Sequence, residues 1–163
     1  MLTAANIVLI ITATACALIA GLFFAYSCSV NLGLGRLHNA EYLKAMKSIN
    51  KAILNPIFFL TFFGTAVLLP LSTILHYEHP ISTPFLFLLV ASILYLTGVM
   101  GITIFGNVPL NNSLDEFNLQ SASEKEISST RAKFEVPWNN LNLIRTIVSA
   151  VSLILIIIAC LSK

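Results

Sequence analysis

The stretch "ISTPFLFLLVASILYLTGVMGITIFGNVPLNN", residues 81–112, contains no charged side chain and is apolar as far as Phe105. About 20 mostly apolar residues are enough to cross a bilayer as a helix. The stretch therefore predicts a membrane-spanning segment. Its last part, "GNVPLNN" at 106–112, is unexpected there, because Asn is costly in hydrocarbon and Pro ends helices.

The composition of the whole chain agrees with a membrane protein. Of its 163 residues, 57% are hydrophobic and only 10% are charged, whereas soluble domains carry about 25% charged residues. The net charge of +2 gives no footprint for nucleic acid. We expect one all-α domain, residues 1–163, folded as an antiparallel four-helix transmembrane bundle in contact with the lipid bilayer. Its spans are placed at roughly 4–30, 55–76, 83–106 and 138–161.

The basic residues predict the orientation of these spans. Eight of the nine Lys and Arg residues lie in or beside the two long connections, between spans one and two and between spans three and four. Basic residues concentrate on the cytoplasmic side. We therefore expect both long connections in the cytoplasm and both termini outside it, and the expected location is a bacterial inner membrane.

The first long connection predicts an amphipathic helix before the second span. Its apolar residues recur at helical spacing and its lysines fall on the opposite face (Tyr42, Met46, Ile49 and Ile53 against Lys44, Lys47 and Lys51). We expect this helix to lie on the membrane surface. Asn55-Pro56 follows, which is typical of an N-cap and a first helical residue, so span two starts afresh there.

Two further patterns concern packing and the second connection. Small residues recur every four positions in span one, which favours close approach of another helix, and Gly98 and Gly101 are candidates for the same role in span three (Ala13, Ala17, Gly21 and Ala25 in span one). The connection at 111–136 mixes Ser with charges of both signs. We expect a short helix there, followed by a mobile stretch.

Polar residues from all four spans gather at the cytoplasmic end of the predicted bundle. They are Tyr26, Asn50, Asn55, Asn107, Asn111, Trp138, Asn142 and Arg145. Convergent polar groups in an apolar setting are the pattern of a small-molecule site. Each Asn can instead serve only as a helix cap.

Arg145 belongs to a stripe of span four that we expect to face away from lipid (Trp138, Asn142, Arg145, Ser149 and Ser152). An intramembrane Arg is a functional-site hypothesis by default. The alternative is a side chain that extends to the interface. No acidic residue lies in any span to pair with it.

Metal and thiol chemistry find little support in the sequence. The cysteines stand singly, without a CxxC motif, and read as small core residues (Cys16, Cys28 and Cys160). No His, Asp or Glu lies within a span, and "HYEHP" at 76–80 reads as a solvated loop. We expect no metal site and no cofactor.

Taken together, these residues resemble the anthrone oxygenase-like family of small four-span membrane proteins. The motifs "GLFFAYS" at 21–27, "AMKSINKAILNPIF" at 45–58, "FFGTA" at 62–66 and "GNVPLNNSL" at 106–114 carry the resemblance, which covers nearly the whole chain. The family's last motif commonly reads Trp-Asn-His-x-Arg-Thr. Here the inner Trp and the His are absent, with Leu141 and Leu143 in their places before Arg145-Thr146.

The resemblance implies oxidation of an anthrone to an anthraquinone, but leaves open whether this chain is an enzyme. In a first hypothesis it is a cofactor-independent oxygenase of anthrone- or hydroquinone-like aromatics. Arg145 and Asn142 would then be catalytic, and the remaining residues would bind the ligand (Tyr26, Asn55, Asn107, Asn111 and Trp138). In the alternative it is a non-enzymatic membrane module that binds a lipid, a quinone-like ligand or a partner protein. A homo-oligomer is left open in both.

Overall fold

The computed structural model describes residues 3–162, and every regular element in that range is helical. The elements are α1 (Ala4–Ala25), η1 (Tyr26–Val30), α2 (Asn31–Leu34), α3 (Asn39–Ala52), α4 (Pro56–Leu75), α5 (Thr83–Leu94), η2 (Tyr95–Gly101), η3 (Thr103–Asn107), α6 (Val108–Glu116) and α7 (Glu124–Leu161). Four continuous helices are long and apolar enough to cross a membrane: Ala4–Leu34, Pro56–Leu75, Thr83–Glu116 and Glu124–Leu161. The predicted all-α fold with four spans is confirmed, and it indicates an integral membrane protein.

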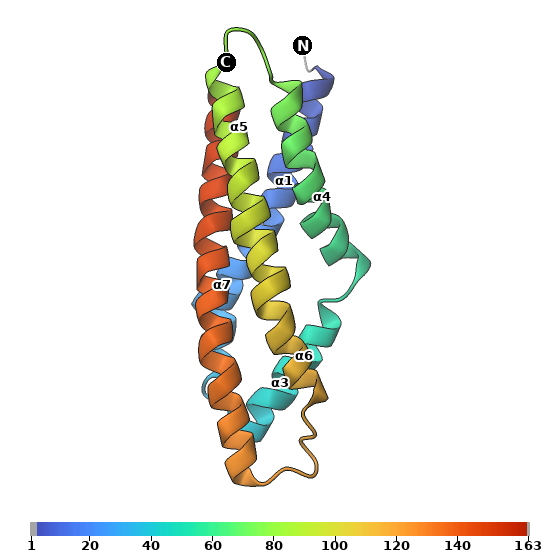
Figure 1. Cartoon of the computed structure of the whole chain (residues 1–163), viewed down its shortest axis with the longest axis vertical. Coiled ribbons are helices and arrows are strands. Elements are labelled where there is room, and N and C mark those ends of the chain that lie inside the picture. Colours follow the sequence, from blue (N-terminus) through green and yellow to red (C-terminus); the bar gives the residue numbers. More distant parts are fainter. Residues whose placement is uncertain (1–2, 163) are drawn as a thin grey trace.

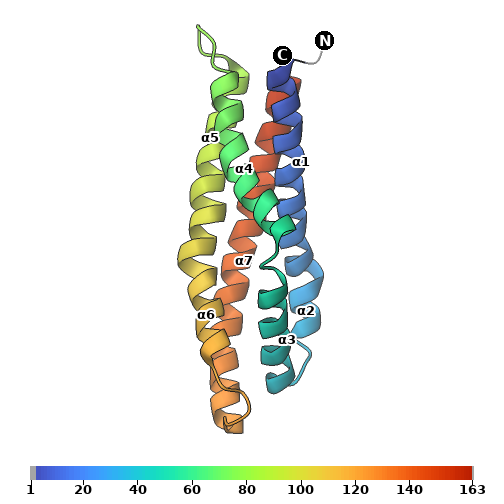
Figure 2. The same ribbon diagram turned by 90° about the vertical axis from the view of Figure 1, so that its right-hand side faces the viewer.

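The four long helices form a ring in which each packs against two others. α1 contacts α4 and α7, and α5 contacts α4 and α7. The start of α1, the end of α7 and the α4–α5 connection lie at one end of the bundle, whereas the α2–α3 and α6–α7 connections lie at the other (Figures 1 and 2). The central core consists of buried side chains from all four helices, among them Ile19, Phe62, Leu88 and Ile156.

Local sequence explains where the helices begin. The Asn55 carboxamide oxygen accepts a hydrogen bond from the backbone N–H of Phe58 at 3.0 Å, and Pro56 occupies the first turn of α4. The prediction that the helix of span two begins at Asn55-Pro56 is therefore confirmed. α7 begins with a capping box in which Ser123 and Glu126 satisfy each other's backbone N–H groups. The hydrogen bonds that the Ser123 side chain and backbone donate to the Glu126 carboxylate lower the pKa of this carboxyl.

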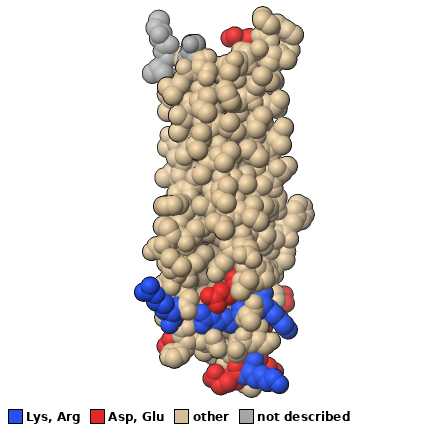
Figure 3. Space-filling model, turned by 90° about the vertical axis from the view of Figure 1, so that its left-hand side faces the viewer, with Lys and Arg blue, Asp and Glu red and all other residues tan. Residues whose placement is uncertain are grey.

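The end of the bundle that carries the long connections is also the charged end. Figure 3 shows Lys, Arg, Asp and Glu gathered there, below a long wall of uncharged atoms. A second core lies at this end, where Tyr42, Leu43 and Met46 of α3 pack against Leu114, Ile127, Phe134 and Trp138. The predicted amphipathic helix is present. Its apolar face, however, packs against α6 and α7 and is buried by them, where we expected it to lie on the membrane surface. The periodicity of one segment could not reveal these partners.

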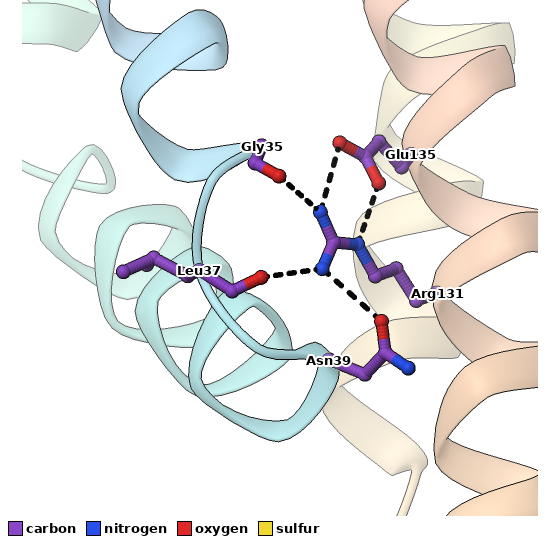
Figure 4. A network of polar contacts seen from close by, with 5 residues as sticks. All are labelled: Gly35, Leu37, Asn39, Arg131 and Glu135. Carbon is purple, nitrogen blue, oxygen red and sulfur yellow. Dashed lines mark hydrogen bonds and ion pairs between the residues drawn. The ribbon is translucent and has the colours of Figure 1, made fainter.

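One arginine joins the α2–α3 connection to α7 (Figure 4). Arg131 donates through Nη1 to the backbone carbonyl of Leu37 at 2.7 Å and through Nη2 to that of Gly35 at 2.9 Å. Its Nε lies 2.6 Å from a Glu135 carboxylate oxygen, and Nη1 also reaches the Asn39 side chain. The guanidinium covers the Tyr42 ring at 4.5 Å. Burial and the Glu135 carboxylate raise the pKa of the Tyr42 hydroxyl, so Tyr42 stays neutral.

Two sequence-based expectations about packing were wrong. The stretch before span four is not mobile as predicted, because α7 is already helical from Glu124 and runs for 38 residues. In α1 the predicted close approach fails at Gly21, where nothing lies within 4 Å of an added Cβ, whereas Ala13 packs against the central core. In span three the predicted close approach is confirmed at Gly98, where an added Cβ would lie 2.7 Å from Cγ1 of Val148.

Three π-helical segments interrupt the long helices. η1 lies between α1 and α2, and η2 and η3 lie between α5 and α6. π-Helical turns are rare in proteins overall, and those that occur are often found at functional sites. Pro109 follows η3 directly in the first turn of α6. The helix therefore continues through "GNVPLNN", although its Pro suggests an end.

Candidate functional site

A cavity of about 90 Å³ lies where α1, η1, η3 and α7 approach the charged end. Its walls are mainly apolar, with side chains such as Leu22, Phe23 and Phe58. The polar and aromatic residues that line it are Tyr26, Asn50, Thr103, Asn107, Asn111, Trp138, Asn142 and Arg145. Within the described residues, no Asp or Glu lines this cavity. Six of the seven predicted site residues therefore come together as expected.

Arg145 is held inside the bundle and is only 5% exposed. Its Nη1 donates to the Thr103 hydroxyl at 3.2 Å, and Nη2 donates to the Asn142 carboxamide oxygen at 3.1 Å. The guanidinium carbon lies 4.3 Å from the centroid of the Phe23 ring and 5.6 Å from that of Trp138. The alternative in which Arg145 extends to the interface is excluded by this geometry.

Asn142 connects Arg145 to the first span. Its Nδ2 donates to the backbone carbonyl of Phe23 at 3.2 Å and to the Ser27 hydroxyl at 3.0 Å, while its Oδ1 accepts from Arg145. The Ser27 hydroxyl also lies 2.9 Å from that of Thr146. Both polar atoms of the Asn142 side chain are thereby used, and its Oδ1 fixes the position of the Arg145 guanidinium.

Trp138 and Tyr26 form an aromatic wall next to this network. The indole Nε1 of Trp138 donates to the Asn111 carboxamide oxygen at 2.9 Å. The ring of Tyr26 is tilted against that of Trp138, with centroids 5.6 Å apart. Flat rings of this kind can pack against an aromatic ligand.

Three polar atoms of the cavity residues are buried and have no hydrogen-bond partner in the protein. They are Nε of Arg145, Oδ1 of Asn107 and Nδ2 of Asn50. Leaving a buried polar atom without a partner costs about 1–3 kcal/mol. All three atoms belong to residues that line the same small cavity.

Asn55 is the predicted site residue that does not line the cavity. Its side chain caps α4 and donates to the backbone carbonyl of Ala52 at 2.8 Å. The expectation that Asn55 belongs to the ligand-binding residues is corrected here, because capping already uses both ends of the Asn55 amide. Thr103 was missed by sequence reasoning, since an isolated Thr inside an apolar span carries no signal of its own.

Comparison with known proteins places these residues in a family. The family model described as anthrone oxygenase matches residues 57–155, which is more than half of the chain. The chain belongs to the anthrone oxygenase family. No curated protein and no solved structure matches it. The family match contains Thr103, Asn107, Asn111, Trp138, Asn142 and Arg145, whereas Tyr26 and Asn50 precede it.

The departures of this anthrone oxygenase family member from the common motif can now be located. Leu143, at the position where the motif has His, is 51% exposed and does not line the cavity. The side chain at this position therefore lies outside the cavity beside Arg145. Leu141, in place of the inner Trp, packs against η3 at Gly106. Neither departure removes a polar group from the cavity of this chain.

Proposed function

We propose that this chain binds a flat aromatic molecule with phenolic or carbonyl oxygens in the cavity beside Arg145. The observation that carries the proposal is the set of three unpartnered buried atoms there, Arg145 Nε, Asn50 Nδ2 and Asn107 Oδ1. Two of them donate to a carbonyl or phenolate oxygen, and one accepts from a hydroxyl. The wall of Phe23, Tyr26 and Trp138 suits the faces of aromatic rings.

The charge of Arg145 favours the ionised form of such a ligand. No carboxylate lines the cavity among the described residues, so the Arg145 charge is free of a counter-ion there. A buried cation of this kind stabilises a phenolate or an enolate by direct attraction. Arg145 would hold the anion, and Asn107 would orient it.

We further propose that a bound anthrone is oxidised by O2 without a cofactor. The electron-rich enolate of an anthrone reacts with O2 at its ring methylene carbon. One oxygen atom becomes the new carbonyl oxygen, and the other leaves as water with the two methylene hydrogens. Among the described residues, Tyr26 and Arg145 are the only ionisable ones that line the cavity, and neither is a good base near neutral pH. The substrate must therefore arrive ionised or lose its proton to water.

The same lack of a base favours an alternative, a module that binds the aromatic without converting it. The two functions separate in one experiment on protein in nanodiscs. Anthraquinone should quench the fluorescence of Trp138, which is the chain's only Trp and lines the cavity. Anthrone should consume O2 faster than in empty nanodiscs if the chain is an oxygenase. Quenching without extra O2 uptake supports the module, and no quenching rejects the site.

Asn107→Leu is the sharpest variant for this site. Its Oδ1 has no partner, and its Nδ2 makes only a 3.5 Å contact to the Trp138 carbonyl. Leu removes a buried unsatisfied acceptor and should leave the thermal stability of ligand-free protein unchanged or higher. Affinity for a hydroxyanthraquinone should fall about tenfold. A large loss of stability with unchanged affinity would instead make Asn107 a structural residue.

Arg145→Leu tests the charge. The Asn142 Oδ1 loses its partner, which costs about 1–3 kcal/mol of ligand-free stability. Removal of a buried charge offsets part of this cost, so the net loss should not exceed that range. Binding of an anionic ligand should be abolished. Arg36→Leu, at an exposed position outside the cavity, is the control. Unchanged binding in Arg145→Leu would remove Arg145 from the site.

We also infer that the charged end faces the cytoplasm, with both termini outside. The charge asymmetry of the connections supports this orientation. It would place the cavity near the inner leaflet of a bacterial inner membrane.

A further inference from the structure

A second cavity of about 120 Å³ adjoins the first. Asn50, Leu54, Val108 and Asn111 line both. Either cavity alone is smaller than the roughly 150 Å³ that suffices for benzene in an apolar protein core. A ligand with several fused rings therefore needs the inner cavity beside Arg145 and this outer cavity as one site.

The outer cavity opens toward the surface of the bundle at the break between α3 and α4. Two shared lining residues are apolar and exposed, Leu54 at 65% and Val108 at 40%. Exposed apolar side chains next to the spans favour contact with lipid over contact with water. Figure 1 shows this break at the side of the bundle, above α3 and α6. An aromatic ligand dissolved in the bilayer could reach the inner cavity by this route.

The far wall of the outer cavity is charged, unlike the inner cavity. It carries Lys47, Lys51 and Asp115. Lys47 donates to the backbone carbonyls of Asp115 and Phe117 at the end of α6, at 2.9 and 2.6 Å. Lys51 lies 3.3 Å from the Asp115 carboxylate, and both side chains are largely exposed. An exposed ion pair of this kind is weak and is readily exchanged for another partner.

The balance of these groups favours an anion. Two ammonium groups face one carboxylate, so the wall has a net positive charge. Asn50 adds a buried Nδ2 donor without a partner at the junction of the two cavities. A carboxylate at this junction would accept a hydrogen bond from Asn50 and attract Lys51. Arg145 would hold the opposite end of the same ligand in the inner cavity.

We propose that the two cavities form a single site for an aromatic acid. This rests on the proposed binding of an oxygenated aromatic beside Arg145. The oxygen-bearing ring lies in the inner cavity, and a carboxylate substituent on the far ring lies in the outer cavity against Asn50 and Lys51. Lys51 and Asn50 are thus specificity-determining residues for the acidic substituent.

The test compares two probes that differ only in the carboxylate, anthraquinone and anthraquinone-2-carboxylate. Both are titrated against Trp138 fluorescence with protein in nanodiscs of uncharged phosphatidylcholine. The native protein should bind the carboxylate about three- to tenfold more tightly. Lys51→Gln should abolish this preference without changing the affinity for anthraquinone. Lys44→Gln should keep it, because Lys44 is an exposed residue of the same helix that lines neither cavity.

Each contrary outcome has a separate meaning. Equal affinity of the native protein for the two probes overturns the aromatic-acid site and leaves the proposed function intact. An equal loss of preference in Lys44→Gln and Lys51→Gln overturns it too, because the effect would then come from overall surface charge. Quenching by neither probe overturns the proposed function itself. Asn50→Leu should lower the affinity for the carboxylate more than that for anthraquinone, and the reverse order contradicts the placement of the acid.

Discussion

Replacing Arg131 by Lys should loosen the charged end of the bundle. Arg131 donates to the backbone carbonyls of Gly35 and Leu37 and to Glu135, and covers the Tyr42 ring. A lysine can keep the contact with Glu135. It lacks the planar guanidinium group, whose N–H donors reach both backbone carbonyls at once. Two lost hydrogen bonds at about 0.5–1.5 kcal/mol each and a cation–π contact of about 0.5–1 kcal/mol give a loss of about 1.5–4 kcal/mol.

The free energy of unfolding can be measured by detergent denaturation followed through Trp138, which belongs to the second core next to this contact. Arg36→Lys, at an exposed position, is the matched control and should stay within about 0.5 kcal/mol of the native protein. A loss below about 0.5 kcal/mol in Arg131→Lys would refute the reasoning. It would mean that water replaces these contacts without cost and that α3 is held by its apolar face alone.

Three other predictions follow from the packing, the orientation and the site. Gly98→Ala should destabilise the bundle by about 1–3 kcal/mol through its contact with Val148, and Val148→Ala should relieve much of this in the double variant, as thermal unfolding would reveal. In a background without native cysteines, a Cys at Ser121 should react with a membrane-impermeant reagent only after cells are opened, whereas one at Glu78 should react in intact cells; the opposite pattern reverses the orientation. The rate of O2 uptake should rise with pH through the pKa of each substrate, and a profile that stays fixed when a more acidic substrate is used would reveal a base in the protein instead.

The four spans and the stripe of α7 could be predicted because they depend on composition and period alone. Arg145, Asn142 and Trp138 recur on one face of a helix, and a face that carries Arg must turn from lipid whatever its neighbours are. The polar layer followed from the alternation of the spans. These features need no knowledge of which side chain meets which.

Other features depend on contacts that a pattern does not encode. Gly21 of α1 and Gly98 of span three carry the same signal, yet Gly98 meets another helix and Gly21 does not. Asn55 and Asn107 look alike in sequence, but Asn55 caps a helix and Asn107 lines the cavity. The helical start of α7 was missed because its face packs on α3, and Ser-rich, charged segments resemble mobile loops when that partner is unknown.

The π-helical segments have a consequence for how this site can vary. Tyr26 opens η1, and Thr103 and Asn107 open and close η3. A π turn holds about one residue more than an α turn, so a single-residue deletion there can be absorbed as an ordinary α turn, and the helix beyond it keeps its phase. Only the residues of the turn itself are then redirected, among them Tyr26 in η1 and Asn107 in η3. A deletion within residues 26–30 or 103–107 should therefore leave the bundle folded while it changes the polar groups that line the cavity.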